Sequence, residues 1–322
     1  WPFLGGWGAF AALEITTCQG GSIARVLASR SEPARAECAA VLGALAQARP
    51  AFAGLEMNRP RIMGILNVTP DSFSDGGAFS TTDTAVAHGI AMLEAGADIV
   101  DVGGESTRPG AAPVDAAEDA RRVLPVIKAL AARGACVSVD TRHAAVMAAA
   151  IGSGARIIND VTALTGDPAA LAIVARSRAS VVLMHMQGDP RTMQASPTYD
   201  WAPGDVFDAL RQRVEACVGA GIGSERIAVD PGIGFGKTAA HSAALLGHIA
   251  MFHGLGCVVA VGASRKSFIG TLGRGEGVED RLAGSLASAL HAVAQGVQIV
   301  RVHDVAETRQ AIAVTDRLVE RN

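Results

Sequence analysis

The stretch Ile62–Gly77, "IMGILNVTPDSFSDGG", combines a buried strand with a polar, turn-rich loop. Its first residues are mostly apolar, as expected of a strand that is buried on both faces of a parallel sheet. Asn67 then leads into a loop with hydroxyl and acidic side chains and a pair of glycines. The rest of the chain repeats this unit, and the repeat predicts the fold.

Short apolar runs alternate with Ala- and Leu-rich amphipathic segments such as 82–97, 114–134 and 278–296. Polar residues before several of these segments and Gly after them are the usual signals for helix ends. Eight strand–helix units in about 260 residues predict a (β/α)8 TIM barrel. A doubly wound sheet shows the same alternation, but no dinucleotide fingerprint follows the first strand. The eight runs are "IMGILNV", "DIVDVGG", "ACVSVD", "RIINDV", "SVVLMHM", "RIAVDPG", "CVVAVGA" and "VQIVRVH".

The composition is that of a globular protein without a nucleic-acid surface. The chain has 322 residues, of which 49% are hydrophobic and 18% charged, enough for one large core. Its 28 Lys and Arg oppose 31 Asp and Glu without a basic stripe, so we expect no nucleic-acid partner. No apolar run approaches the ~18 residues of a membrane span, and the apolar start lacks the basic flank of a signal peptide. Five separated cysteines without a C-x-x-C pair favour reduced, mostly buried thiols, so we expect a cytoplasmic protein.

Polar side chains lie at the C-terminal end of every apolar run. In a barrel these ends meet at one mouth, where the active sites of this fold are built. A helix cap explains any single one of them, but caps favour Ser, Thr and Asp rather than Lys, Arg or His. The residues are Asn67, Asp101, Glu105, Asp140, Asn159, Asp160, His185, Asp230, Arg265, Lys266, Arg301 and His303.

The predicted mouth has two chemical halves. One half offers carboxylates, an amide and an ammonium group, which suit the N–H edge of a flat heterocycle such as guanine. The other offers guanidinium, imidazole and amide groups, which suit an anion and especially a phosphate. The first half consists of Asp140, Asn159, Asp230 and Lys266, and the second of Asn67, Arg108, Arg301 and His303.

The sequence argues against several other kinds of catalytic site. Residues 231–238, "PGIGFGKT", resemble the end of a P-loop, but Pro231 stands where Gly is required, which argues against nucleotide hydrolysis. Lys266 could form a Schiff base, as lysines in barrels often do. The acidic residues expected around the ring instead favour Lys266 as a cation that binds a carbonyl or nitrogen of the ligand. Neither a Ser-His-Asp order nor H-E-x-x-H occurs, so hydrolase readings lack support.

Eight motifs, one per predicted unit, resemble those of the dihydropteroate synthase family of pterin-binding TIM barrels. The resemblance covers about Arg61 to the C-terminus, so residues 61–322 are expected to form the pterin-binding barrel. Corrinoid-linked methyltransferase domains share the pterin pocket but are not expected to carry the first two loops in this form. The motifs are "GILNVTPDSFSDGG", "DVGGESTRPGA", "SVDT", "INDV", "LMHMQG", "DPGIGFGKT", "SRKSFIG" and "RVHDV".

The resemblance implies a role for each matching residue. The implied pterin-binding residues are Asp140, Asn159, Asp230, Lys266, Met184 and Phe235. The implied diphosphate-binding residues are Asn67, Thr107, Arg108, Arg301 and His303, with Asn67 also coordinating Mg²⁺. The implied p-aminobenzoate pocket consists of Phe73, Pro109, Lys266 and Ser267. The implied catalytic residues are Asn67, Asp75, Arg108 and Lys266, with Asp75 over the reacting carbon.

The resemblance also implies a reaction. A transferase of this family joins 6-hydroxymethyl-7,8-dihydropterin diphosphate to p-aminobenzoate, giving 7,8-dihydropteroate and diphosphate for folate biosynthesis, and is a sulfonamide target. Departure of diphosphate through a delocalised pterin-methyl cation needs no strong general base, which fits a mouth without a nucleophile–base pair. Both substrates are small molecules, and a homodimer is the expected assembly.

Two alternatives belong to other classes. A silent pterin-binding paralogue would tend to lose Asn67, Asp75, Arg108 or His303, and all four are present. A scaffold built on an inactive barrel would have even less reason to keep a polar mouth. Residues 68–79 are expected to form a mobile flap that brings Phe73 and Asp75 over the substrates, the alternative being a plain surface Ω-loop.

Residues 1–60 lie outside the resemblance. Residues 7–18 and 22–31 predict two strands joined by a Gly-containing turn. The stretch 32–55 predicts an amphipathic helix with Pro33 near its first turn and Pro50 just past its end. We expect a β-hairpin plus helix that packs on the barrel, most simply closing its N-terminal floor. A separate interaction module is the alternative.

Overall fold

The computed structural model describes residues 2–3, 8–9, 12–19, 22–29, 43, 45, 47–69, 81–105, 114–189 and 192–319. Eight parallel strands close into a barrel in the order β10-β11-β12-β5-β6-β7-β8-β9, which confirms the predicted TIM barrel. The strands are β5 (Arg61–Asn67), β6 (Ile99–Gly103), β7 (Val137–Asp140), β8 (Ile157–Asp160), β9 (Ser180–Met184), β10 (Ile227–Asp230), β11 (Val258–Val261) and β12 (Ile299–Val302).

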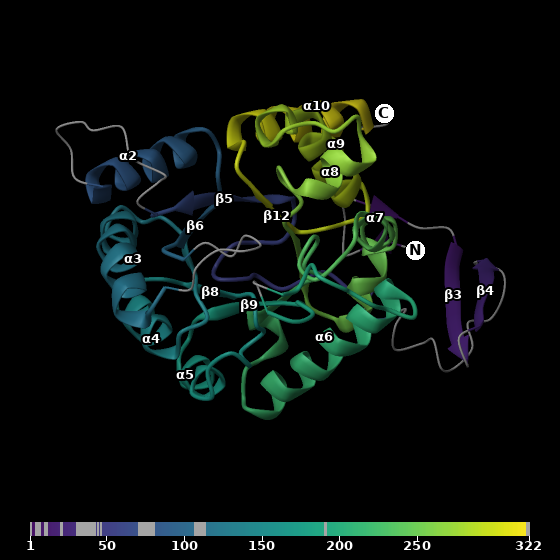
Figure 1. Ribbon diagram of the computed structural model, residues 1–322, viewed down its shortest axis with the longest axis horizontal. Helices are drawn as coiled ribbons and strands as arrows, with labels where there is room; N and C mark the ends of the chain where they lie inside the picture. Colours follow the sequence, from purple (N-terminus) through teal and green to yellow (C-terminus); the bar gives the residue numbers. More distant parts are fainter. Residues whose placement is uncertain are drawn as a thin grey trace.

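Helices form a ring around these strands (Figure 1). They are α2 (Thr81–Glu94), α3 (Ala116–Ala131), α4 (Ala144–Gly152), α5 (Ala170–Arg176), α6 (Ala202–Gly219), α7 (Ala239–Gly247), α8 (Ser267–Leu272), α9 (Leu282–Ala294) and α10 (Val305–Val319), with the 3-10 turns η3 (Ser224–Arg226), η4 (Ile249–Leu255) and η5 (Val278–Asp280). Among the helices described, none is both long enough and apolar enough to cross a bilayer.

Each barrel strand alternates between an outer and an inner face. In β5, Ile62 and Leu66 belong to the large core cluster between strands and helices, whereas Met63 belongs to a separate cluster inside the barrel. Because successive side chains of a strand point to opposite faces, Ile65 and Asn67 share the inner face with Met63. The same alternation therefore sends the last inward residue of a strand into the mouth.

The barrel floor is filled by two residues of the N-terminal segment. Phe52 and Met57 are buried with the inward side chains at the starts of the strands, including Met63 and Ile299. A tight turn presents Phe52, since Phe52 and Leu55 each donate a backbone hydrogen bond to the other at 2.9 Å. The floor plug, defined as residues 52–57, is thus a loop rather than a strand or helix.

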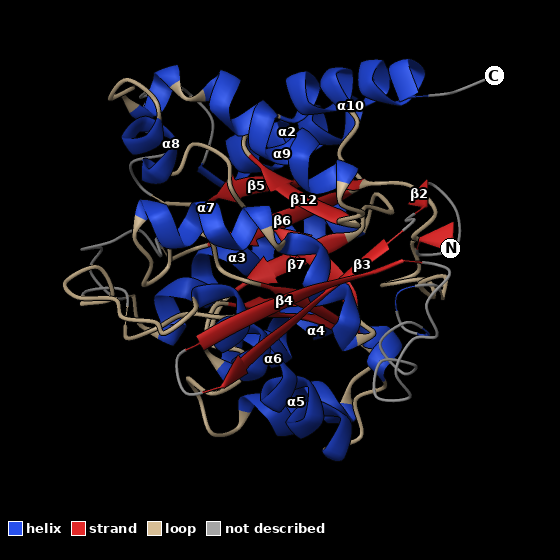
Figure 2. Cartoon of the chain, turned by 90° about the vertical axis from the view of Figure 1, so that its right-hand side faces the viewer, coloured by secondary structure: helices blue, strands red, loops and turns tan. Residues whose placement is uncertain are grey.

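The predicted hairpin is present as an antiparallel pair, β3 (Ala12–Gln19) and β4 (Ser22–Ser29). Both views place it outside the ring of helices, at the right edge of Figure 1 and toward the viewer in Figure 2. A second pair, β1 (Pro2–Phe3) with β2 (Gly8–Ala9), was not expected from the sequence. Of the predicted helix, Gly43 and Leu45 are described and helical. The packing of the hairpin on the barrel stays a prediction.

Three cysteines have described side chains. Cys136, Cys217 and Cys257 are buried free thiols, which confirms the expectation for these three positions.

Candidate active site

The barrel mouth holds a cavity of about 440 Å³. Residues at the ends of the barrel strands or in the loops that follow them line it together, although they lie far apart in the sequence, and Glu105 after the second strand is one of them. The predicted site residues among them are Asn67, Asp140, Phe235, Lys266, Ser267, Arg301 and His303. The predicted residues Phe73, Asp75, Thr107, Arg108 and Pro109 lie outside the described part of the chain.

Arg301, the inward residue of β12, links three strands by ion pairs. Its Nε donates to Asp101 Oδ2 at 2.6 Å, and its Nη2 donates to Asp140 Oδ2 at 2.7 Å. Asn159 donates its side-chain N–H to the same oxygen of Asp101 at 3.0 Å. Two of the predicted pterin-binding residues are therefore connected to Arg301, one directly and one through Asp101.

Asp140 lies at the centre of this network in a buried position. Burial raises the pKa of the Asp140 carboxyl to about 7, while Arg301 lowers it and the nearby carboxylates of Asp101 and Asp160 raise it further. A carboxyl whose pKa lies near neutral pH can either accept or donate a hydrogen bond, depending on its protonation. The mouth therefore offers a group whose charge state a bound ligand can set.

Asp230 and Lys266 lie close enough for their charges to interact. Burial raises the pKa of Asp230, and the charge of Lys266 opposes this effect. Burial likewise lowers the pKa of Lys266 to about 8, with Asp230 opposing. The Lys266 ammonium also donates to the backbone O of Ile233 and lies 4.4 Å from the centroid of the Phe235 ring.

This geometry provides a hydrogen-bonding edge beside an aromatic wall. Carboxylates at Asp140 and Asp230 and the amide of Asn159 can pair with N–H groups along one edge of a flat ring. Lys266 is placed to donate to a ring carbonyl or nitrogen, and Phe235 to cover the ring face. Buried Met184, whose strand β9 pairs with β10 at Asp230, adds an apolar surface beside that carboxylate.

Comparison with known proteins identifies the family. The pterin binding enzyme family matches residues 63–303. Dihydropteroate synthase of Escherichia coli K12 is 48% identical over 263 residues, covering 81% of this chain and 93% of that protein. The chain belongs to the dihydropteroate synthases.

Solved structures of these enzymes share the fold. Xanthomonas albilineans dihydropteroate synthase with 4-aminobenzoic acid has a TM-score of 0.79 at 48% identity, covering 84% of this chain and 97% of that chain. The same enzyme in complex with 7,8-dihydropteroate has a TM-score of 0.76 at 45% identity, covering 83% of this chain and 97% of that chain.

Lys237 belongs to the same neighbourhood of this dihydropteroate synthase but was not singled out from its sequence. Its buried ammonium lies 3.0 Å from His185 Nδ1 and donates to the backbone O of His185 at 3.2 Å and of Phe235 at 2.9 Å. The Tyr199 ring lies 6.0 Å away. Lys237 therefore ties the loop after β9 to the loop that carries Phe235. The only sequence signal was its place in the "DPGIGFGKT" motif.

Two polar residues at strand ends of this enzyme stabilise the fold through polar contacts. Asp160 caps the loop that follows β8, accepting from Thr162 N at 2.8 Å and from Leu164 N at 2.9 Å. Arg265 lines the mouth cavity and also pairs through its guanidinium with Asp304. The capping explanation is thus correct for Asp160, because its place in the strand alternation turns it away from the barrel interior.

Proposed function

We infer that this chain is a dihydropteroate synthase, a transferase that condenses 6-hydroxymethyl-7,8-dihydropterin diphosphate with p-aminobenzoate. The observation that carries the inference is the set of Asp140, Asn159 and Asp230 at the barrel mouth, in a chain 48% identical to an enzyme of that name. The products are 7,8-dihydropteroate and diphosphate.

The bond changes balance without a further reactant. The bond between the pterin methylene carbon and the diphosphate oxygen breaks, and the electron pair leaves with diphosphate. The reduced ring donates electron density to the methylene carbon, and the aryl amine nitrogen then bonds to that carbon. The amine gives up one proton to solvent or to the departing diphosphate. No strong general base is required, which agrees with the chemistry of the described mouth.

The residues of the mouth bind and orient the pterin. Asp230 accepts N–H bonds from the ring, and Lys266 donates to it while resting on Phe235. Arg301 and His303 line the same cavity, and we propose that they contact the diphosphate. Because Arg301 already pairs with Asp101 and Asp140, an anion would share its guanidinium with two carboxylates.

The donor set of the mouth fits Mg²⁺ that arrives with the substrate. Asn67 offers one amide oxygen at the cavity edge, and no group of three His, Cys, Asp or Glu suitable for a metal occurs within the described residues. Mg²⁺ usually keeps several waters and binds through one or two protein oxygens plus substrate phosphates. Asn67 would hold the ion, which when bound would neutralise charge on the leaving diphosphate.

The p-aminobenzoate pocket is proposed from the sequence motifs. Ser267 lines the mouth cavity beside Lys266. We propose that Phe73, Pro109 and Ser267 surround p-aminobenzoate, that Thr107 and Arg108 contact the diphosphate, and that Asp75 lies over the reacting carbon. Substitution of Phe73 or Pro109 is then expected to weaken p-aminobenzoate and sulfonamides while sparing the pterin.

Diphosphate release tests the proposed function. Purified protein given pterin diphosphate, p-aminobenzoate and Mg²⁺ should release diphosphate and form 7,8-dihydropteroate in equal amounts. Binding of the pterin without turnover would instead identify a silent pterin-binding protein, and no binding at all would refute both.

Assembly and location are further proposals. We propose a homodimer in the cytoplasm, and light scattering coupled to gel filtration measures the assembly directly. A monomer at working concentrations would contradict the first proposal.

A further inference from the structure

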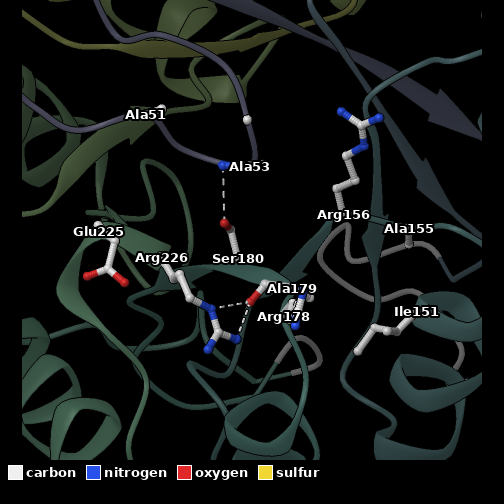
Figure 3. Close-up of a pocket in the computed structure, with 11 residues that line it drawn as sticks. Ala51, Ala53, Ile151, Ala155, Arg156, Arg178, Ala179, Ser180, Glu225 and Arg226 are labelled. Carbon is white, nitrogen blue, oxygen red and sulfur yellow. Dashed lines mark hydrogen bonds between the residues drawn. The ribbon is translucent and has the colours of Figure 1, made fainter.

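A second cavity lies on the barrel floor, at the opposite end from the mouth. Its volume is about 360 Å³, and it forms where the floor plug meets the segments that lead into β8, β9 and β10. Ala51, Ala155 and Ala179 form part of its wall, and their small side chains leave the space open. Figure 3 shows the residues that line it. It shares no lining residue with the mouth cavity.

The floor cavity carries an excess of positive charge. Among the residues that the structure describes, three arginines line it, Arg156, Arg178 and Arg226, against one carboxylate, Glu225. The chain as a whole has a formal charge of -3, so this local excess runs against the overall balance. An anion is the kind of ligand that such a cavity attracts.

Two of these arginines have no partner within the described part of the chain. Arg156 and Arg178 are exposed, and neither guanidinium makes a hydrogen bond or ion pair with a described residue. Glu225 is exposed as well and forms no ion pair with any of the three within the same residues. Both guanidinium groups are therefore available to a ligand.

Arg226 is held in place without losing its charge. Its Nε donates to the backbone O of Ala179 at 3.1 Å, and its Nη2 donates to the backbone O of Val174 at 3.1 Å. Figure 3 shows the Arg226 guanidinium against the Ala179 carbonyl. Because both acceptors are neutral carbonyls, the positive charge of Arg226 stays uncompensated by these bonds.

Other arginines of the floor share a carboxylate. The guanidinium groups of Arg59, Arg61 and Arg309 all bond to Asp98, at 2.5, 3.1 and 2.8 Å. Arg156 lowers the pKa of the Cys136 thiol and Asp98 raises it, so both residues lie near Cys136 in the same region of the floor. The carboxylate is saturated by its three partners, which leaves Arg156 without it.

The cavity also has one fixed polar contact. Ser180 is buried and accepts a hydrogen bond from Ala53 N at 3.2 Å, as Figure 3 shows. Its hydroxyl proton makes no hydrogen bond to a described residue, so it can be donated to a ligand oxygen. Ala53 itself has a φ of 52, an uncommon value for a residue with a side chain. The turn therefore imposes this backbone conformation, which alanine does not favour by itself.

We propose that the floor cavity is a binding site for a small phosphorylated metabolite. Arg156 and Arg178 would hold the phosphate, because the guanidinium fork matches phosphate oxygens in pairs. Arg226 adds favourable charge, and the alanine-rich wall contacts the remainder of the molecule. A volume of 360 Å³ lies within the range of about 300–1,000 Å³ that is typical of small-molecule pockets. The proposal does not depend on pterin chemistry at the mouth.

Methyl NMR at Ile151 tests this site directly, because Ile151 lines the cavity and lies away from the mouth. The full chain, labelled at isoleucine methyl groups, is titrated with inorganic phosphate, with adenosine 5′-monophosphate and with succinate. We expect saturable shifts of the Ile151 methyl with both phosphates and at least roughly tenfold weaker binding of succinate. Tighter binding of the nucleotide than of inorganic phosphate would support a phosphorylated metabolite, whereas equal binding would indicate a site for the free ion and contradict the metabolite. Equal binding of succinate, or no shift at Ile151, would refute the proposal.

Charge variants provide the matched control. Arg156→Gln and Arg178→Gln should each weaken phosphate binding roughly tenfold, as expected for loss of a charge-assisted hydrogen bond. Arg176→Gln removes the same charge from an exposed position at the end of α5 that does not line the cavity, and should bind as the unchanged protein does. Glu225→Gln should tighten binding. Equal losses in Arg156→Gln and Arg176→Gln would mean that net charge alone attracts the ions. Diphosphate release should be the same in all four variants.

Discussion

At the scale of single residues, the mouth is a set of buried charges that control one another. Arg301 holds Asp101 and Asp140 together, and Lys266 faces Asp230. Burial alone would favour the neutral forms, and the opposite charges oppose that tendency. A ligand that replaces water in this mouth therefore meets groups whose protonation it can still change, which suits a heterocycle with several N–H groups.

Asp230→Asn tests the pterin-binding role. The amide can still accept the 2.7 Å hydrogen bond from Gly232 N, but its NH₂ group cannot accept an N–H from the ring. Pterin affinity measured by calorimetry should fall roughly tenfold or more, as expected when a buried donor is left unpaired. Asp208→Asn, an exposed change on α6, serves as the control. Unchanged pterin affinity in Asp230→Asn would show that Asp230 does not bind the pterin.

Lys237 makes stability depend on pH in a predictable direction. Burial lowers the pKa of Lys237 to about 7, from an ordinary value of 10.5. Between these values the unfolded chain binds more protons at this position than the folded chain does. The free energy of unfolding that Lys237 contributes therefore rises with pH across this window and is lowest below it.

The measurement compares unfolding midpoints of the unchanged protein and Lys237→Met at about pH 6 and about pH 9. We expect the unfolding midpoint of the unchanged protein to increase relative to that of Lys237→Met as the pH rises. Lys128→Met, at an exposed position of α3, should follow the unchanged protein. A constant difference between Lys237→Met and the unchanged protein would show that Lys237 does not titrate in this window.

At the scale of elements, the loops after β9 and β10 form one unit beside Asp230, the proposed pterin-binding carboxylate. Lys237 joins them by hydrogen bonds, and Gly232 lets them approach each other. A side chain added at Gly232, whose φ is 67, would meet the backbone O of His185 at 1.9 Å. The close approach therefore requires glycine for two separate reasons, its backbone conformation and the missing side chain.

Comparison of Gly232→Ala with Gly256→Ala distinguishes the cost of the backbone conformation from the cost of the side-chain clash. Gly256 has a similar φ of 74, but a side chain added there meets nothing within 4 Å. Gly256→Ala should cost about 1 kcal/mol of unfolding free energy from the left-handed backbone alone. Gly232→Ala should cost clearly more in denaturant titrations and also weaken pterin binding, because the loop must move away from His185. Equal costs would show that the contact with His185 relaxes freely.

Much of this arrangement was predictable from the sequence, because strand alternation is a local property. Asn67, Asp140 and Asp230 end apolar runs, and a period of two turns them into the mouth once the barrel is assumed. The pairing of Arg301 with Asp101 was not predictable, since they lie 200 residues apart. The same holds for Lys237, whose partners are mostly backbone atoms that leave no trace in the sequence.

At the scale of the whole molecule, the barrel is closed at one end and open at the other. The mouth is lined by charged and polar side chains, whereas the floor is filled by Phe52 and Met57. Sequence patterns predicted a floor cover within residues 1–60 but pointed to the hairpin and helix rather than to the plug. The plug is a six-residue loop without hydrophobic periodicity, so no pattern marked it.

Two truncations distinguish the plug from the rest of the N-terminal segment. Deletion of residues 1–46 keeps Phe52, Met57 and the hydrogen bond of 2.7 Å from Arg49 to the backbone O of His253. Deletion of residues 1–60 removes all three and exposes the apolar inner side chains of the strand starts. We expect the longer deletion to lower the free energy of unfolding much more than the shorter one.

Phe52→Ala in the full chain isolates the plug, since the Phe52 side chain is fully buried. Loss of a buried Phe side chain typically costs about 3–5 kcal/mol, and denaturant titration measures this directly. The polar mouth is built by the opposite ends of the strands, so the folded fraction of Phe52→Ala should keep its pterin affinity and its rate of diphosphate release. The same should hold for the shorter truncation. A folded variant with intact stability but collapsed turnover would show that the N-terminal segment reaches the active site, and that the floor and the mouth are not independent.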